Sequence, residues 1–138
     1  MNAVLDASVF VAALSPTERH HAQARRLFER LPESTPYLVP TLFRVEVIAA
    51  LSRRGESVEL LDLVDAMMVG PRFHAVPLDS AVLDVALKVS RAARIRAYDA
   101  VYVAVAMQAE APLCTLDREV RIRVEATFPG VVIWTEPE

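Results

Sequence analysis

The chain has 138 residues, of which 54% are hydrophobic and 24% are charged, and its net charge at pH 7 is −3. This length fits a single domain, and the apolar content excludes an intrinsically disordered chain. The longest apolar stretches, near residues 9–14 and 100–107, are far shorter than the ~20 residues of a membrane-spanning helix. We therefore expect residues 1–138 to form one domain with no membrane association. Because no signal-peptide pattern follows the first residue, we also expect a cytoplasmic protein.

The basic residues are clustered although the net charge is negative. Of the 15 Lys and Arg residues, all except Lys88 are arginine. A net charge of −3 argues against a protein that coats nucleic acid through bulk charge, whereas guanidinium groups suit local contacts with phosphate oxygens. The alternative interpretation is that these clusters are ordinary solvated helix faces.

The pattern of apolar residues in the first half of the chain predicts two strands and four helices. In chain order these are a strand at 3–6, helices at 8–14 and 16–31, a strand at 37–39, and helices at 41–54 and 57–69. Thr41 is a good N-cap residue, and Gly55 is typical of a helix end.

The second half of the chain alternates between strands and helices. The predicted elements are a strand at 73–76, helices at 79–93 and 98–109, a strand at 113–115, a helix at 117–126 and a strand at 131–133. Asp79 is expected to cap its helix, and the helix at 98–109, apolar on all sides, belongs in the interior. Short strands that are apolar on both faces indicate a parallel sheet. We therefore predict an α/β three-layer sandwich with a central five-stranded parallel sheet.

Four acidic residues lie in apolar surroundings. Asp6 ends the first strand, Glu46 lies in an apolar helix, Asp99 is the only charge in the helix at 98–109, and Asp117 follows the fourth strand. Carboxylates are rarely buried unless their charge is compensated. Three of them have a structural alternative as caps of helix N-termini. Glu46 has a different alternative, an ion pair with a residue such as Arg44.

The predicted topology brings these acids together. The carboxyl ends of parallel strands share one edge of the sheet, so Asp6 and Asp117 must lie there, and Asp99 can be placed beside them. Converging carboxylates raise each other's pKa unless a cation neutralises them. Oxygen ligands without His or Cys favour Mg²⁺ or Mn²⁺. An acid cluster with such an ion suits phosphodiester hydrolysis by metal-activated water.

The segments that carry the acids also match a known pattern. They are Val-Leu-Asp-Ala-Ser-Val at 4–9, Leu-Phe-Arg-Val-Glu-Val at 42–47, Tyr-Asp-Ala-Val-Tyr-Val-Ala-Val-Ala at 98–106 and Cys-Thr-Leu-Asp at 114–117. Their sequence and order resemble the four acidic motifs of PIN-domain ribonucleases. The chain length resembles, over essentially the whole chain, the VapC-type toxins of type II toxin–antitoxin systems.

The resemblance implies a Mg²⁺- or Mn²⁺-dependent endoribonuclease toxin with four catalytic, metal-binding acids: Asp6, Glu46, Asp99 and Asp117. Ser8 matches the small hydroxyl residue that follows the first acid, and it either caps its helix or binds a metal-bound water. Thr115 is expected to orient the carboxylate of Asp117. Contacts to RNA phosphates and bases are expected from Arg94, Arg96, Tyr98 and Arg118.

Two protein partners are also expected. The resemblance implies an antitoxin, and the surplus of apolar side chains in the segments 9–14, 22–31 and 60–68 predicts a groove for its C-terminal segment. The helices around Glu46 and at 79–93 carry more apolar surface than one sheet layer covers, which predicts a homodimer.

Two other classes of function remain open from the sequence. In a phosphatase, Asp6 would be a covalent nucleophile, but the chain lacks the second acid two residues later that such enzymes use. A phospho-accepting module of the receiver type would need a Lys near the acidic pocket, and Lys88 lies in the middle of a predicted helix.

Overall fold

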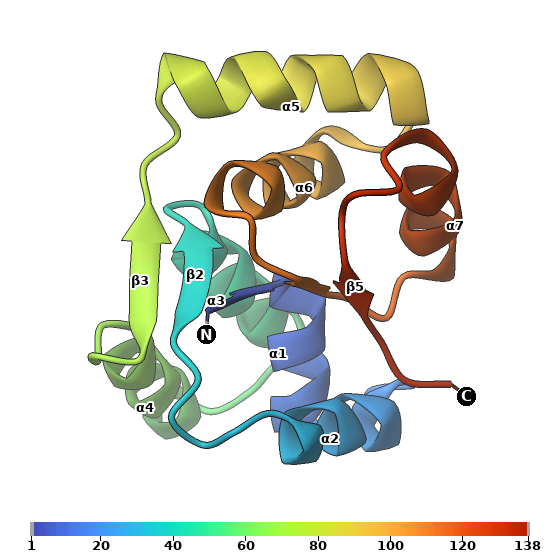
Figure 1. The fold of residues 1–138 in the computed structure, drawn as a ribbon. Coiled ribbons are helices and arrows are strands. Elements are labelled where there is room, and N and C mark those ends of the chain that lie inside the picture. Colours follow the sequence, from blue (N-terminus) through green and yellow to red (C-terminus); the bar gives the residue numbers. More distant parts are fainter. Residues whose placement is uncertain (1, 138) are drawn as a thin grey trace.

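Five parallel strands form the centre of the fold in the computed structural model, which describes residues 2–137 (Figure 1). The strands are β1 (Ala3–Leu5), β2 (Tyr37–Pro40), β3 (Phe73–Val76), β4 (Leu113–Cys114) and β5 (Ile133–Trp134). The helices are α1 (Ala7–Leu14), α2 (His21–Arg30), α3 (Phe43–Arg53), α4 (Val58–Met68), α5 (Ser80–Ala93), α6 (Ala97–Ala109) and α7 (Arg118–Thr127). The predicted five-stranded parallel sheet and α/β class are confirmed.

In the strand order β3-β2-β1-β4-β5, β1 is the central strand, with β2 and β3 on one side of it and β4 and β5 on the other. The direction in which successive strands are added therefore reverses at β1. β1 pairs with β2 on one side and with β4 on the other, and Leu5 lies opposite Cys114. The residues that follow these two, Asp6 and Thr115, therefore leave the sheet side by side. Such a switch point is where open α/β sheets bind ligands.

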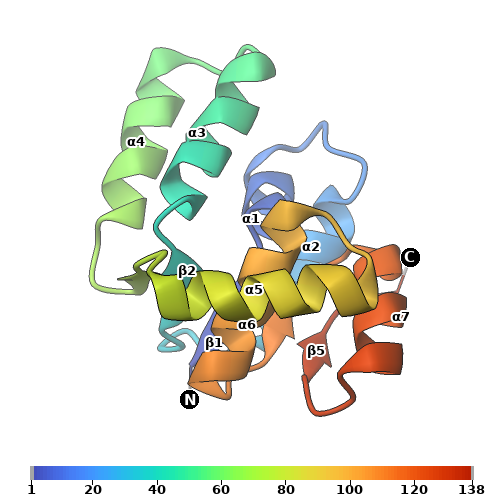
Figure 2. The same ribbon diagram turned by 90° about the horizontal axis from the view of Figure 1, so that it is seen from above.

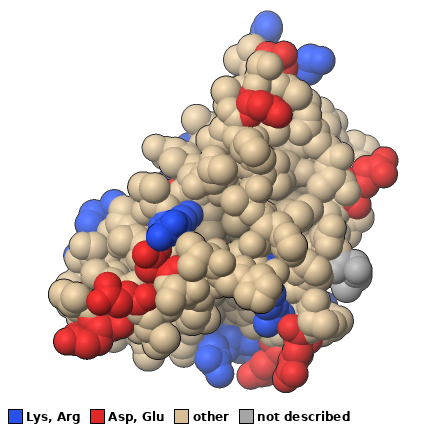
Figure 3. Space-filling view, turned by 90° about the vertical axis from the view of Figure 1, so that its left-hand side faces the viewer, with Lys and Arg blue, Asp and Glu red and all other residues tan. Residues whose placement is uncertain are grey.

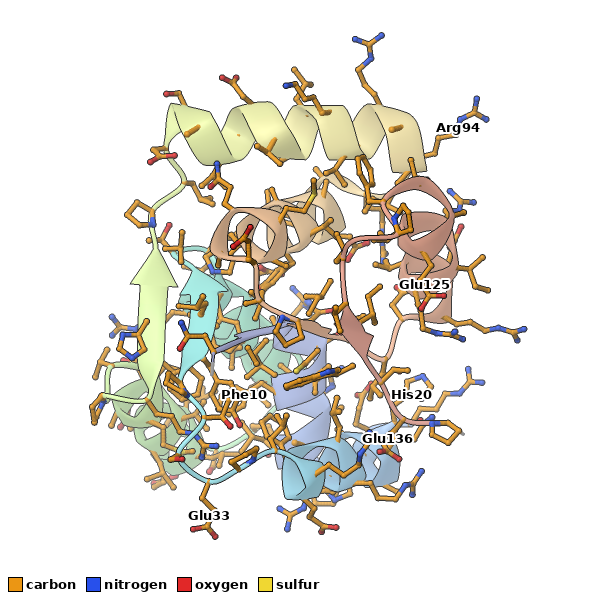
Figure 4. The ribbon with its side chains drawn as sticks, in the orientation of Figure 1. Phe10, His20, Glu33, Arg94, Glu125 and Glu136 are labelled. Carbon is orange, nitrogen blue, oxygen red and sulfur yellow. The ribbon has the colours of Figure 1, made fainter. Side chains whose placement is uncertain are left out.

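Helices cover both faces of the sheet, as Figure 1 shows, with α5 and α6 on one side and α1, α2 and α4 on the other. Helix α6 packs on β1, β2 and β4, and its residues 100–106 are all buried, which confirms the prediction for this segment. On the opposite side, Phe10 points from α1 into the interior (Figure 4). Its ring centroid lies 5.7 Å from that of Phe43 and 5.4 Å from that of Phe73.

Helices α3 and α4 form a pair that projects from the rest of the molecule (Figure 2). Ser57 caps α4, since its Oγ accepts a hydrogen bond from the Leu60 N–H at 3.1 Å. The two helices are joined by an ion pair in which Nη2 of Arg44 lies 2.9 Å from Oδ2 of Asp65. Arg44 is therefore bound to Asp65 and does not compensate Glu46.

Several predicted helix starts differ from the structure because tertiary hydrogen bonds decide them. Thr41 does not cap α3: the N-cap residue is Leu42, which makes no side-chain capping hydrogen bond, and the N–H of Thr41 donates to the Val76 carbonyl at 3.0 Å, which continues the sheet. The helix begins two residues later, which places Glu46 in its first turn. Residues 16–20 form turns, and α2 starts only at His21. The caps expected locally are correct, since Asp79 accepts from the Val82 N–H at 3.0 Å and Gly55 has a φ of +75°.

Strand β3 differs from the expectation that every strand is apolar on both faces. It lies at the edge of the sheet, and its residues His74 and Ala75 are exposed. The last strand also starts later than expected, at Ile133, because the N–H of Val131 donates to the Phe128 carbonyl in a turn. None of the helices described between residues 2 and 137 has the length and hydropathy of a transmembrane segment.

Candidate active site at the carboxyl edge of the sheet

Asp6 stands at the junction of β1 and α1, at the centre of the carboxyl edge. Its Oδ1 accepts a hydrogen bond from the Ser8 N–H at 3.2 Å, so Asp6 is the N-cap of α1. The capping interpretation of Ser8 is therefore wrong, because the residue at the boundary is two positions earlier. The Ser8 side chain is exposed beside the acid cluster.

Thr115 links the ends of β1 and β4. Its hydroxyl donates to Oδ2 of Asp6 at 3.0 Å and accepts from the N–H of Asp117 at 3.2 Å. Thr115 thus orients the carboxylate of Asp6 and the backbone of Asp117, whereas the sequence predicted that it orients the carboxylate of Asp117. That carboxylate caps α7 through the Val120 N–H at 3.0 Å.

Glu46 reaches the same edge from the first turn of α3. Its Oε1 accepts a hydrogen bond from the hydroxyl of Tyr102, on α6, at 2.9 Å. Burial and the nearby Glu46 carboxylate raise the pKa of Tyr102 above its ordinary value of 10.0, so the phenol keeps its proton and remains a donor. Tyr102 therefore holds Glu46 in place without neutralising its charge.

Asp99 and Asp117 share a guanidinium group. Asp99 lies in the first turn of α6, and its Oδ2 is 3.3 Å from Nε of Arg96. Oδ2 of Asp117 is 3.6 Å from Nη2 of the same arginine. Arg96 therefore bridges two acids that belong to different helices.

The acids at this edge of the sheet also influence one another electrostatically. Burial raises the pKa of the Asp6, Glu46 and Asp99 carboxyls above their ordinary values. The charge of Asp99 adds to this rise at Asp6 and at Glu46, while the guanidinium of Arg96 opposes it at Asp99. Asp99 therefore lies within electrostatic reach of Asp6 and Glu46, and Arg96 joins Asp99 to Asp117.

The PIN domain family model matches residues 3–124 of the chain, a range that includes all four acids. The chain belongs to the PIN domain family. The resemblance carried by the four acidic motifs is therefore confirmed. No curated protein matches the sequence of this PIN domain.

Solved structures with the same fold include proteins of toxin–antitoxin systems. VapC20 of Mycobacterium tuberculosis, a sarcin-ricin loop cleaving toxin, superposes with a TM-score of 0.72 at 16% identity and covers 87% of this chain and 93% of its own. FitAcB of Neisseria gonorrhoeae has a TM-score of 0.71 at 16% identity, with 96% of both chains covered. A toxin–antitoxin complex from Klebsiella pneumoniae has a TM-score of 0.68 at 17% identity and covers 94% and 95%.

The donor set of this PIN domain suits a hard divalent cation, because the cluster offers carboxylate oxygens. Within residues 2–137, no three His, Cys, Asp or Glu side chains lie close enough together to hold one ion as they stand. Each carboxylate is instead held by a neighbour: Thr115, Tyr102 or Arg96. Binding of an ion by several of these acids therefore requires the side chains to shift.

Two hollows meet beside the acid cluster and share Ser8 and Glu18. One has a volume of 410 Å³ and contains Glu46 and Tyr98, and the other has a volume of 390 Å³ and contains Asp117 and Arg118. Basic side chains from distant parts of the chain line both hollows: Arg53 and Arg54 in the first, Arg19 and His20 in the second.

The residues predicted to contact RNA are not all brought together. Tyr98 is 59% exposed in the first hollow, Arg118 lines the second, and Arg96 bridges two of the acids. Arg94 ends α5 and points away from the body of the protein (Figure 4). It lines neither hollow.

Sequence reasoning missed several residues of the site. Tyr102 lies three positions after Asp99 and so faces the same side of α6, and its buried hydroxyl needs a partner. That signal was available in the sequence. Arg53 and Arg54 carried no comparable signal, because their place beside the acids depends on how α3 leaves the sheet.

Proposed function

We propose that this PIN domain is a metal-dependent endoribonuclease and the toxin of a toxin–antitoxin pair. The observation that carries the proposal is the placement of Asp6 and Asp117 after the paired strands β1 and β4 at the switch point of a PIN fold, where Arg96 joins Asp117 to Asp99. The description of VapC20, which has the same fold, as a sarcin-ricin loop cleaving toxin supports RNA as the substrate.

The four carboxylates would hold Mg²⁺ or Mn²⁺, which supplies an activated water and neutralises charge on the phosphate. The residues of this chain prepare the site for that ion. Thr115 and Tyr102 each hold one carboxylate, of Asp6 and Glu46, at the carboxyl edge through a single hydrogen bond, so a shift of the side chains alone would bring these acids to an ion. Partial burial of the acids reduces the competition from water and strengthens their interaction with a cation.

The two hollows provide contacts for a single strand of RNA. The exposed ring of Tyr98 suits stacking of a base, and the guanidinium groups of Arg53, Arg54 and Arg118 suit phosphate oxygens. We assign Arg94 no contact at the acid cluster, because its side chain points away from the body of the protein.

Sequencing of RNA ends tests the proposal most directly. RNA from cells after controlled expression of the chain is expected to carry new ends at defined positions, and the Asp99→Asn chain should produce none of them. Equal sets of ends from both chains would contradict nuclease activity at this site. If labelled substrate instead leaves a phosphate on an aspartate, the phosphatase or phospho-accepting alternative holds.

An apolar hollow of 500 Å³ fits the expected antitoxin segment. It lies among α1, α2, the end of α4 and the adjoining strands. These three helices correspond to the segments 9–14, 22–31 and 60–68, for which the sequence predicted the groove. Its apolar lining consists of Phe10, Ala13, Leu14, Phe28, Leu31, Tyr37, Met67 and Phe73. Arg25, Glu29 and Glu33 also line the hollow and give an amphipathic segment polar partners.

Exposed apolar side chains support the homodimer. Val45 on α3 is 63% exposed, and Leu83 and Leu87 on α5 are 47% and 61% exposed. The face on the side of β3 and α4 has few charged side chains near its centre (Figure 3). A second copy of the chain would remove this apolar surface from water.

Light scattering at micromolar concentration tests both assemblies. The chain alone is expected to have twice its monomer mass of 15.3 kDa. After co-expression with the small protein encoded beside it, the two should purify as one larger complex. A monomer mass contradicts the dimer, and separate elution with unchanged toxicity to the host contradicts the antitoxin.

A further inference from the structure

Arg96 occupies an unusual position, because it is an exposed cation bonded to half-buried acids. Its side chain is 81% exposed, whereas those of its partners Asp99 and Asp117 are 15% and 32% exposed. The backbone of Arg96 is extended at the N-terminal boundary of α6, and its side chain makes no capping hydrogen bond there. The guanidinium thus contacts Asp99 and Asp117 from their solvent side.

Arg96 also provides the positive charge that is bonded to the cluster. Among residues 2–137, the ion pairs that involve Asp6, Glu46, Asp99 or Asp117 are the two made by Arg96. The hydroxyl partners of the other two acids, Thr115 and Tyr102, are neutral. While no metal is present, the guanidinium of Arg96 therefore offsets the repulsion between the carboxylates of Asp99 and Asp117.

We propose that Arg96 is a built-in counter-cation of the acid cluster, which competes with a divalent metal ion for Asp99 and Asp117. This proposal rests on the proposed metal-dependent function of the same site. Arg96 contacts Oδ2 of both carboxylates, and the other oxygen of Asp117, Oδ1, already accepts the hydrogen bond that caps α7. An ion that binds these two acids through Oδ2 must therefore displace the guanidinium.

The geometry makes this exchange easy. The side chain of Arg96 is already largely in water, and exposed ion pairs contribute little stability, so its release costs little. A divalent ion carries twice the charge of the guanidinium and has a smaller radius, so it interacts more strongly with the same oxygens. The apparent metal affinity of the site is then lower than it would be without Arg96.

A calorimetric titration with Mn²⁺ tests the proposal on the complete chain. Arg96→Gln is expected to tighten Mn²⁺ binding by about three- to tenfold, because the ion no longer competes with the ion pairs that Arg96 makes to Asp99 and Asp117. The matched control is Arg118→Gln. It removes the same charge next to Asp117, from a residue that forms no ion pair within residues 2–137. We expect the control to change the affinity less than about twofold, as for an exposed charge without a direct contact.

Thermal melting provides a second readout that does not depend on activity. Without metal, the Arg96→Gln chain should melt slightly below the wild type, because the repulsion between Asp99 and Asp117 is no longer offset but an exposed ion pair contributes little stability. Saturating Mn²⁺ should bring the two melting temperatures together, which also shows that the variant folds.

The possible failures can be told apart. Equal or weaker Mn²⁺ binding by Arg96→Gln, or an equal gain in Arg118→Gln, overturns the counter-cation proposal and leaves the nuclease proposal standing. If neither the wild type nor Arg96→Gln binds Mn²⁺, the proposed metal-dependent function fails as well. Binding by Arg96→Gln alone supports the competition in its strongest form.

Discussion

Removal of divalent metal is expected to lower the rate of RNA cleavage by at least about 100-fold. Without a divalent cation, the four carboxylates repel both the phosphate and an attacking hydroxide, and the leaving oxygen lacks the charge stabilisation that the ion would supply. The measurement is cleavage of a labelled RNA by purified protein after dialysis against EDTA. Addition of Mg²⁺ or Mn²⁺ in excess of the chelator should restore the rate.

The control for metal removal is a measurement that shows whether the protein stays folded in EDTA. Removal of the ion breaks none of the hydrogen bonds that Thr115, Tyr102 and Arg96 make to the acids. A melting curve in EDTA should therefore show a cooperative transition. Full cleavage in EDTA, by protein in which elemental analysis finds no metal, contradicts the metal mechanism.

Asp6→Asn is expected to reduce cleavage by about 100-fold or more, because it removes a charged ligand from the centre of the cluster. The same change should leave the melting temperature in EDTA level or raise it. Burial and the charge of Asp99 raise the pKa of Asp6, so its charged form destabilises the fold, and Asn lacks that charge. An Asn side chain still accepts from the Ser8 N–H and donates to the Thr115 hydroxyl.

The pH dependence of stability follows from the same shift. Because the pKa of Asp6 is higher in the folded state than its ordinary value of 3.8, the folded protein binds more protons than the unfolded chain between the two values. Stability therefore falls as the pH rises through this window, and the loss is complete above the folded pKa. The Asp6→Asn chain should show a smaller fall in melting temperature over the same range.

Asp65→Asn is the matched control for this substitution. Hydrogen bonds from Arg44 lower the pKa of Asp65, so the charged form of this exposed acid favours the fold. The Asp65→Asn chain should keep the wild-type cleavage rate and should not gain stability at neutral pH. A large fall in melting temperature for Asp6→Asn, or a loss of cleavage in Asp65→Asn, contradicts the assigned roles.

Much of the fold could be predicted from local patterns. The alternation of apolar strands and helices gave the parallel sheet, and the uninterrupted apolar run of α6 gave its central position. The same pattern placed Asp6 and Asp117 at strand ends, where a parallel sheet must bring them to one edge. The start of α3 could not be predicted this way, because it depends on a hydrogen bond from Thr41 to the distant carbonyl of Val76.

The sequence by itself therefore determined the fold class and the four candidate acids, because periodicity and charge placement are local properties. Only the tertiary structure decided how each acid is held. Thr115 reaches Asp6 across 109 positions, and Tyr102 reaches Glu46 across 56. These pairs, and the bridge from Arg96 to Asp99 and Asp117, depend on strand order and on how the helices cross the sheet. Such long-range contacts are fixed by packing of the whole chain and leave no periodic trace in the sequence.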